Sequence, residues 1–174
     1  SLDVDELASL VTERTRLIVL NSPANPTGGV MSAEQMAQVA KIAQARGIPV
    51  LADEIYSRML YEGEFASITS VPGMAEQTII LDGWSKTYAM TGWRLGYGVM
   101  PVELARQITK LMVNSNSCTA AFTQMAGIEA LTGPQDSVDA MLAAFRRRRD
   151  LMVAGMNSIP GFRCLTPKGA FYVF

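Results

Sequence analysis

A lysine, an arginine and an aspartate are the residues of this sequence whose chemistry stands out. Lys86 and Arg94 are the only cations in DGWSKTYAMTGWRLGYG, a stretch whose glycines, hydroxyl groups and aromatic rings suit the lining of a pocket. Asp53 ends an apolar run further upstream. An amine becomes a nucleophile only where burial or nearby positive charge favours its neutral form, and Arg94 could help to supply that charge. Covalent chemistry at an amine is therefore the first hypothesis.

The absence of histidine limits the other chemistry that is possible. With His 0 in the composition, Ser-His-Asp triads, Cys-His dyads and most zinc sites are excluded, so acid–base work falls to Lys, Asp, Glu or Tyr. Cys118 and Cys164 lack metal-ligand spacing, so we expect no metal site and interpret both as small buried hydrophobic residues. A serine–lysine hydrolase dyad of Ser85 and Lys86 is disfavoured, because adjacent side chains in an extended loop point apart.

The composition favours a globular protein that binds neither nucleic acid nor membranes. The 174 residues carry a formal net charge of −1 and no basic footprint, and their apolar runs are too short to span a bilayer. The start shows no signal-peptide pattern and the two cysteines form no disulfide framework, which favours the cytoplasm. Because the chain starts without Met and stops within GAFYVF, which we predict to be a strand, we expect a piece of a longer protein.

Alternating strand and helix patterns predict an α/β fold. Apolar runs over 16–21, 48–53, 78–82 and 95–100 are the predicted strands, and their continuous apolar character is typical of a sheet covered on both faces. One predicted helix begins at a capping box formed by Ser32 and Gln35 and ends at Gly47. The other helices are predicted over 1–14, 101–113, 119–131 and 135–157.

The pair Gly133-Pro134 interrupts this pattern before the last long helix. We therefore predict a large domain over 1–133, and a linking helix with the beginning of a small domain over 134–174. Four consecutive arginines, 146–149, point in several directions around that helix. We interpret them as a solvated face with some interface pairing rather than as an anion site.

Polar residues follow three of the predicted strands. Asn25 lies in NSPANPTGG after the first, Asp53 and Tyr56 lie in LADEIY at the second, and Lys86 follows the third. In an open α/β sheet, ligands bind at the carboxyl ends of the strands. Each residue alone has an ordinary structural explanation. Together with Arg94 they match what a phosphorylated pyridine aldehyde needs, namely a lysine for a Schiff base, an acid for the ring nitrogen, and donors for the phenolate and phosphate.

The stretches NSPANPTGG, LADEIY and SKTYAMTGWRLGY resemble class I/II aminotransferases, which are fold type I pyridoxal-phosphate enzymes. The resemblance covers nearly the whole chain. It implies the three-layer αβα sheet of the family's large domain, truncated at both ends, and pyridoxal 5′-phosphate as the cofactor. It also implies that Lys86 forms the Schiff base and then carries the proton between Cα and C4′ of the substrate–cofactor pair. Asp53 would keep the pyridine nitrogen protonated.

The same resemblance implies roles for four further residues. Asn25 and Tyr56 would hydrogen-bond the ring oxygen of the cofactor, and Ser85 and Arg94 would hold its phosphate. The implied reaction is transamination between an L-amino acid and a 2-oxo acid, in a homodimer. Two alternatives stay open: a carbon–sulfur lyase of the same fold, and a non-catalytic aminotransferase-like domain of a transcription regulator.

The sequence also departs from the family pattern. The upstream phosphate-binding turn and stacking aromatic residue of the family have no counterpart in these 174 residues. The downstream arginine that receives the substrate carboxylate has none either. We therefore expect this chain by itself to be inactive, or nearly so.

Overall fold

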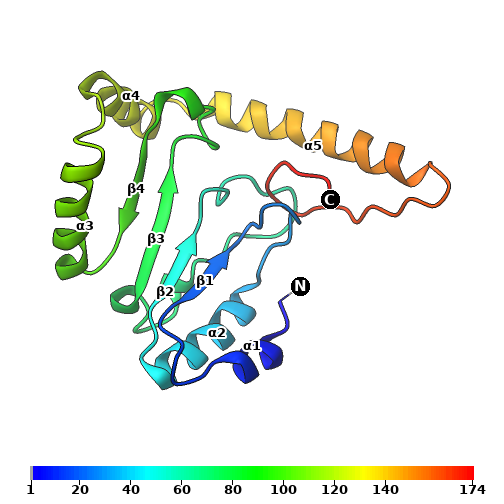
Figure 1. Cartoon of the computed structure of the whole chain (residues 1–174). Coiled ribbons are helices and arrows are strands. Elements are labelled where there is room, and N and C mark those ends of the chain that lie inside the picture. The colour runs from blue at the N-terminus through cyan, green and yellow to red at the C-terminus, as the bar shows by residue number, and fades with distance from the viewer. Residues whose placement is uncertain (1) are drawn as a thin grey trace.

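The computed structural model describes residues 2–174 and confirms an α/β fold (Figure 1). The strands are β1 (Ile18–Asn21), β2 (Val50–Asp53), β3 (Thr78–Gly83) and β4 (Gly96–Val99). The helices are α1 (Val4–Leu10), α2 (Ala33–Arg46), α3 (Val102–Ser115), α4 (Ala121–Thr132) and α5 (Asp136–Asn157), with short 3₁₀ helices at Ile68–Ser70, Ala75–Gln77 and Thr91–Trp93. Ser1, where the first predicted helix begins, lies outside the described residues. Within 2–174, no helix combines the length and apolar character needed to cross a bilayer.

The four strands form one sheet in the order β1-β2-β3-β4. β1, β2 and β3 are parallel, and β4 pairs antiparallel with β3. The register places Asn21 opposite Asp53, and Asp53 opposite Leu81. Because parallel strands end at the same edge, the residues that follow β1, β2 and β3 emerge beside one another, as the sequence predicts.

Helix α2 begins and ends at the predicted residues. The Ser32 hydroxyl accepts a hydrogen bond from the Gln35 amide at 3.2 Å, and the Gln35 side chain accepts one from the Ser32 amide at 3.0 Å. This reciprocal pair satisfies two of the free N–H groups of the first turn. At the other end Gly47 adopts the left-handed conformation, with φ of 60°, which glycine enters without steric cost.

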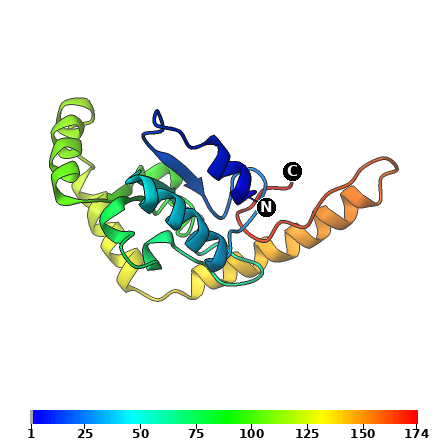
Figure 2. The same ribbon diagram turned by 90° about the horizontal axis from the view of Figure 1, so that it is seen from below.

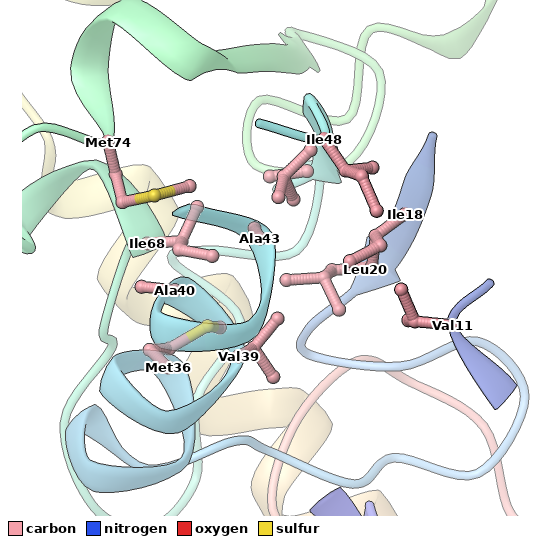
Figure 3. Close-up of a cluster of buried hydrophobic side chains, with 12 residues drawn as sticks. Val11, Ile18, Leu20, Met36, Val39, Ala40, Ala43, Ile48, Ile68 and Met74 are labelled. Carbon is pink, nitrogen blue, oxygen red and sulfur yellow. The ribbon is translucent and has the colours of Figure 1, made fainter. Parts of the chain in front are cut away.

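The main hydrophobic core lies between α2 and one face of the sheet (Figure 3). The side chains that α2 contributes follow the helical spacing expected from the sequence: Met36, Val39, Ala40 and Ala43. They pack with alternate residues of the first two strands: Ile18, Leu20, Val50 and Ala52. Burying one Val, Leu or Ile side chain in this way stabilises the folded state by roughly 1.5–3 kcal/mol. This burial attaches α2 to the sheet that carries the candidate site.

The opposite face of the sheet is open in the described residues, although the apolar runs predict a cover on both faces. Val19 and Leu81 project from that face and expose 64% and 39% of their surface. Figure 1 shows α1 and α2 on the covered side and α3 beside β4, at the edge of the sheet. A continuous apolar run indicates that a face needs cover, but not which segment provides it.

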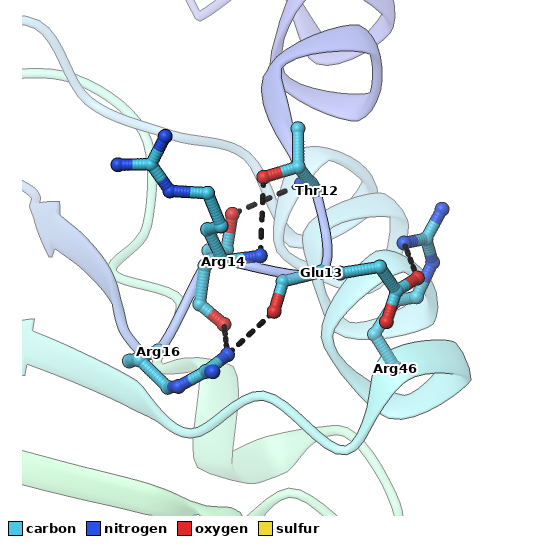
Figure 4. Close-up of polar contacts among 6 residues, drawn as sticks. Thr12, Glu13, Arg14, Arg16 and Arg46 are labelled. Atoms are coloured by element: carbon cyan, nitrogen blue, oxygen red, sulfur yellow. Dashed lines mark hydrogen bonds and ion pairs between the residues drawn. The ribbon is translucent and has the colours of Figure 1, made fainter.

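An ion pair links the turn between α1 and β1 to the end of α2 (Figure 4). Arg46 pairs with Glu13 at 3.3 Å, and Arg16 donates to the Glu13 carbonyl at 2.6 Å. Arg46 and Glu13 expose 47% and 97% of their side chains, so this ion pair contributes at most about 1 kcal/mol.

Residues 169–174, predicted as a strand, form none. Their only sheet-like pairing within the described chain is an isolated antiparallel bridge between Leu60 and Gly169. Ala170 has φ of 57°, which interrupts an extended conformation. Figures 1 and 2 show the chain after α5 running back along that helix, so that its red C-terminal end lies near the loops of the sheet. Ala170 is buried by packing against those loops, whereas Phe171 and Phe174 expose 36% and 80% of their surface.

The arginines of α5 divide into two kinds. Arg147 and Arg148 are exposed, as predicted. Arg149 exposes only 10% of its side chain, lies 4.8 Å from the centre of the Tyr61 ring, and donates to the Pro167 carbonyl at 3.1 Å. Arg149 also pairs with Glu62 at 3.1 Å, so it attaches α5 to two loops. These contacts are the pairing expected from the sequence.

Candidate active site

Hydrogen bonds at the ends of β1 and β2 arrange the first side chains of the site. The Asn21 side-chain oxygen accepts from the Asn25 amide at 2.6 Å, and its nitrogen contacts the Asp53 carbonyl at 3.5 Å. Asp53 itself accepts from the Ile55 amide through Oδ1 at 3.2 Å. The Asn21 bonds link the Asn25 loop to the backbone at the end of β2, and the Ile55 bond fixes the orientation of the Asp53 carboxylate.

Tyr56 is the buried centre of the cluster. The residue is 2% exposed, and its hydroxyl lies 2.7 Å from the hydroxyl of Tyr172. The Tyr172 hydroxyl also accepts from Asn25 Nδ2 at 3.2 Å. Burial raises the pKa of Tyr56, and the neighbouring Tyr172 and the negative charge of Asp53 raise it further. Tyr56 is therefore a protonated hydroxyl that can donate a hydrogen bond at neutral pH.

Lys86 lies against the same group. Its Nζ is 6.0 Å from the centre of the Tyr56 ring and 5.6 Å from that of Phe171, within the range of a cation–π contact. The backbone around it is tightly turned, since the Ala89 amide donates to the Lys86 carbonyl at 3.2 Å and Ala89 has φ of 53°. The structure thus brings Asn25, Asp53, Tyr56 and Lys86 together at the carboxyl ends of the three strands.

Two further carboxylates make this end of the sheet negative. Burial raises the pKa of Glu54, whose Oε1 accepts from the Ser67 hydroxyl at 2.6 Å. Burial also raises the pKa of Asp82, and the charge of Asp53 adds to that effect. Burial and Asp82 together raise the pKa of Tyr97 to about 12. Glu54 and Asp82 are thus bonded to protein groups, which leaves Asp53 as the acid proposed for a ligand.

The structure gives Arg94 and Ser85 no contact with the Lys86 cluster among residues 2–174. Arg94 is exposed in the left-handed conformation, with φ of 54°, and donates to the Thr91 carbonyl at 2.8 Å. It lines a cavity of about 770 Å³ whose walls include Phe122 and Cys118. The role of Ser85 and Arg94 in holding a phosphate stays a prediction.

The two cysteines differ, which corrects one sequence-based interpretation. Cys164 is buried as predicted, whereas Cys118 is exposed. Cys118 lies in the connection from α3 to α4, where it lines the Arg94 cavity. The residue type favours burial, but burial requires a segment that packs over this connection.

Sequence reasoning missed Phe171 and Tyr172 as site residues. Both lie in the segment predicted to be a strand of the small domain. The Phe171 ring makes edge contact with Tyr56 at 5.4 Å and stacks on Phe145 of α5 at 5.5 Å. The one signal in the sequence was a tyrosine hydroxyl inside an apolar run, because a buried hydroxyl needs a partner.

Gly28 joins the Asn25 loop to the segment that carries Tyr172. Its carbonyl accepts from the Lys168 and Gly169 amides at 2.9 and 3.0 Å. Gly28 has φ of 66°, and a Cβ there would overlap Pro167 and lie 3.0 Å from the Gly169 carbonyl oxygen. Only glycine therefore allows the two segments to approach this closely.

We expect Gly28→Ala to lower the free energy of unfolding by about 2–4 kcal/mol, because backbone strain and overlap with Pro167 act together. Gly63→Ala is the matched control, since Gly63 has φ of 77° but no atom within 4 Å of an added Cβ. The control should lose only about 1 kcal/mol. Urea unfolding followed by tryptophan fluorescence measures both. Equal losses would show that close approach to Pro167 is unimportant.

The fold and this cluster agree with a known family. A family model described as aminotransferase class I and II matches residues 1–174. The chain therefore belongs to the class I and II aminotransferases, which confirms the resemblance found in the sequence.

Individual relatives and solved structures support the same assignment. The aspartate aminotransferase of Musicola paradisiaca (strain Ech703) is 41% identical over 169 residues, which are 97% of this chain and 42% of that protein. The aromatic aminotransferase of Pyrococcus horikoshii OT3 superposes with a TM-score of 0.96 at 37% identity, over 99% of this chain and 47% of that one. The aspartate aminotransferase of Thermus thermophilus with maleate superposes with a TM-score of 0.92 at 37% identity, over 99% of this chain and 45% of that one.

These matches establish the fold of the chain as that of fold type I aminotransferases. The chain spans less than half the length of the relatives that it matches.

Proposed function

We propose that the protein containing these residues is a pyridoxal-phosphate-dependent aminotransferase, which moves an amino group between an L-amino acid and a 2-oxo acid. The observation that carries the proposal is the convergence of Lys86, Tyr56 and Asp53 at one edge of an aminotransferase sheet. Relatives named aspartate aminotransferase and aromatic aminotransferase support this class of substrate.

The donor set fits the ring of pyridoxal phosphate. The polar atoms of Asn25 and Tyr56 converge, since they lie 3.2 and 2.7 Å from the same Tyr172 oxygen. Asn25 carries a second N–H, and a protonated Tyr56 carries one hydrogen, so both could bond a further phenol-type oxygen. Asp53 would hold the ring nitrogen and Lys86 would bond the aldehyde carbon. Ser85 and Arg94 would hold the phosphate, a role supported by the family motif.

Bound in this way, the cofactor supplies an electron sink for the substrate Cα–H bond. The amine of Lys86 would take the proton from the substrate Cα and deliver it to C4′ of the cofactor. The rings of Tyr56 and Phe171 flank that amine and shield it from water on their side. The carboxylate of Asp53 would keep a proton on the ring nitrogen, and the Tyr56 O–H would donate to the ring oxygen.

Four wider features belong to the same proposal: the division into domains at 1–133 and 134–174, a homodimeric assembly, a cytoplasmic location, and little or no activity of the 174 residues alone. The last follows from the 42–47% of relatives that the chain spans. Large apolar side chains of α4 are exposed: Phe122, Met125, Ile128 and Leu131. An apolar surface of this kind needs further chain or a partner subunit to cover it.

The test is a substrate assay on the complete polypeptide that carries these residues, loaded with pyridoxal phosphate. We expect an L-amino acid to be consumed only when an acceptor 2-oxo acid is present, with one product amino acid formed per substrate used. Release of ammonia and thiol from a cysteine thioether without an acceptor would instead indicate a carbon–sulfur lyase. Cofactor binding without turnover on any amino acid would indicate a regulator.

A further inference from the structure

The hydroxyl of Tyr172 connects the two residues proposed to hold the cofactor ring oxygen. It lies 2.7 Å from the Tyr56 hydroxyl and accepts from Asn25 Nδ2 at 3.2 Å. Tyr172 is 147 residues from Asn25 and 116 from Tyr56 along the chain. No local sequence feature brings these three groups together, so the tertiary fold creates the contact.

The number of hydrogens available determines the direction of this hydrogen-bond chain. The amide nitrogen of Asn25 only donates, so the Tyr172 oxygen accepts from it. Between the two tyrosines either hydroxyl could be the donor. If Tyr56 donated to Tyr172, it would have no hydrogen left for a ligand. If Tyr172 donates to the Tyr56 oxygen, the Tyr56 hydrogen is free to bond a third oxygen.

We propose that Tyr172 is a positioning residue that directs the Tyr56 O–H toward the cofactor ring oxygen. The donor order is Asn25 to Tyr172, Tyr172 to Tyr56, and Tyr56 to the ligand. This inference rests on the proposed function, because a phenolate acceptor is what selects this order over the reverse.

The surroundings hold Tyr172 in place for this role. Its ring makes edge contact with the Tyr56 ring at 5.9 Å and packs on Phe171 at 4.7 Å. The backbone before it is anchored to the Gly28 carbonyl and to the Met59 carbonyl, which accepts from the Ala170 amide at 2.9 Å. The hydroxyl is thus presented by a segment attached at several points. Charge also favours the arrangement, because Asp53 and burial keep the hydrogen on Tyr56.

Tyr172→Phe tests the inference, because it removes the hydroxyl and keeps the ring. The control is Tyr61→Phe, since Tyr61 is a buried tyrosine whose hydroxyl makes no hydrogen bond within the described residues. A hydrogen bond to the ring oxygen draws negative charge away from the lysine-bound nitrogen and lowers its pKa. In Tyr172→Phe the pKa of the lysine-bound chromophore, followed by absorbance against pH, should therefore rise by about 0.5–1 unit. Tyr61→Phe should leave it unchanged.

A double-mutant cycle shows whether Tyr172 acts through Tyr56. We expect Tyr172→Phe to weaken equilibrium binding of pyridoxal phosphate by about 3- to 10-fold. In a Tyr56→Phe background the same change should have almost no further effect. With a cofactor analogue that lacks the ring oxygen, Tyr172→Phe and the unmodified protein should bind equally.

The outcomes separate this inference from the proposed function. If the unmodified protein forms no borohydride-reducible adduct at Lys86, the proposed function and the role of Tyr172 both fail. If the adduct forms but Tyr172→Phe shifts neither the chromophore pKa nor the binding constant, only the role of Tyr172 is overturned. Full additivity with Tyr56→Phe would likewise overturn it, because Tyr172 would then act independently of Tyr56.

Discussion

Lys86→Ala should eliminate the covalent attachment of pyridoxal phosphate and lower transamination by about 10⁴-fold or more. The variant loses both the nucleophile that bonds the aldehyde and the base that moves the Cα proton, and positioned bases alone contribute about 10²–10⁴-fold. The centres of the Tyr56 and Phe171 rings lie 6.0 and 5.6 Å from Nζ, but neither side chain offers a replacement amine. Borohydride reduction followed by peptide mass spectrometry, with steady-state kinetics on the complete polypeptide, measures both effects.

Lys41→Ala is the matched control for this result. Lys41 is an exposed lysine of α2, on a different part of the chain from the strand ends. Its replacement should leave the reducible adduct and the rate within about twofold of the unmodified protein. An adduct that persists in Lys86→Ala, or that maps to another lysine, would disprove the assignment of Lys86.

Asp53→Asn should lower kcat/KM by about 10²–10³-fold, the range found when one aligned electrostatic group is removed from an active site. The amide keeps an oxygen for the Ile55 N–H, which now donates to Oδ1 at 3.2 Å, so the turn after β2 is retained. What is lost is the negative charge that stabilises a protonated ring nitrogen. Stopped-flow measurement of the half-reaction with an amino acid places the loss in the chemical step.

Asp82→Asn provides the comparison, because Asp82 lies at the end of the neighbouring strand and is also partly buried. Its carboxylate accepts from the Gly83 amide at 2.6 Å and from the Tyr97 hydroxyl at 3.3 Å. We expect a loss of less than about fivefold, because this acid is committed to those groups. Equal losses in the two variants would mean that the general charge of the strand ends matters, and not Asp53 specifically.

Much of the scaffold was predictable because it depends on local patterns. The capping box of Ser32 and Gln35, helical spacing of apolar residues and Gly47 together located α2 correctly, since each acts within a few residues. The convergence of Asp53 and Lys86 was also predictable. Both follow apolar runs that became parallel strands, and parallel strands end at one edge.

Other features depended on contacts that no local pattern encodes. The apolar run at 169–174 predicted a buried strand, but no strand forms. Ala170 and Tyr172 instead pack near Tyr56 and α5, while Phe174 is exposed. The exposure of Cys118 depends on what packs over the connection from α3 to α4. The position of Arg94 beside the Phe122 cavity, without contact to Lys86, also follows from how those helices pack.

The sequence by itself determined which chemical groups this protein has available, an amine, a carboxylate and a phenol placed just after buried strands, because strand and helix periodicity are local properties. Only the tertiary structure decided that Tyr172 joins Asn25 and Tyr56, because the chain must first pass through α5 and reverse direction. Contacts between residues more than a hundred positions apart depend on the packing of whole elements.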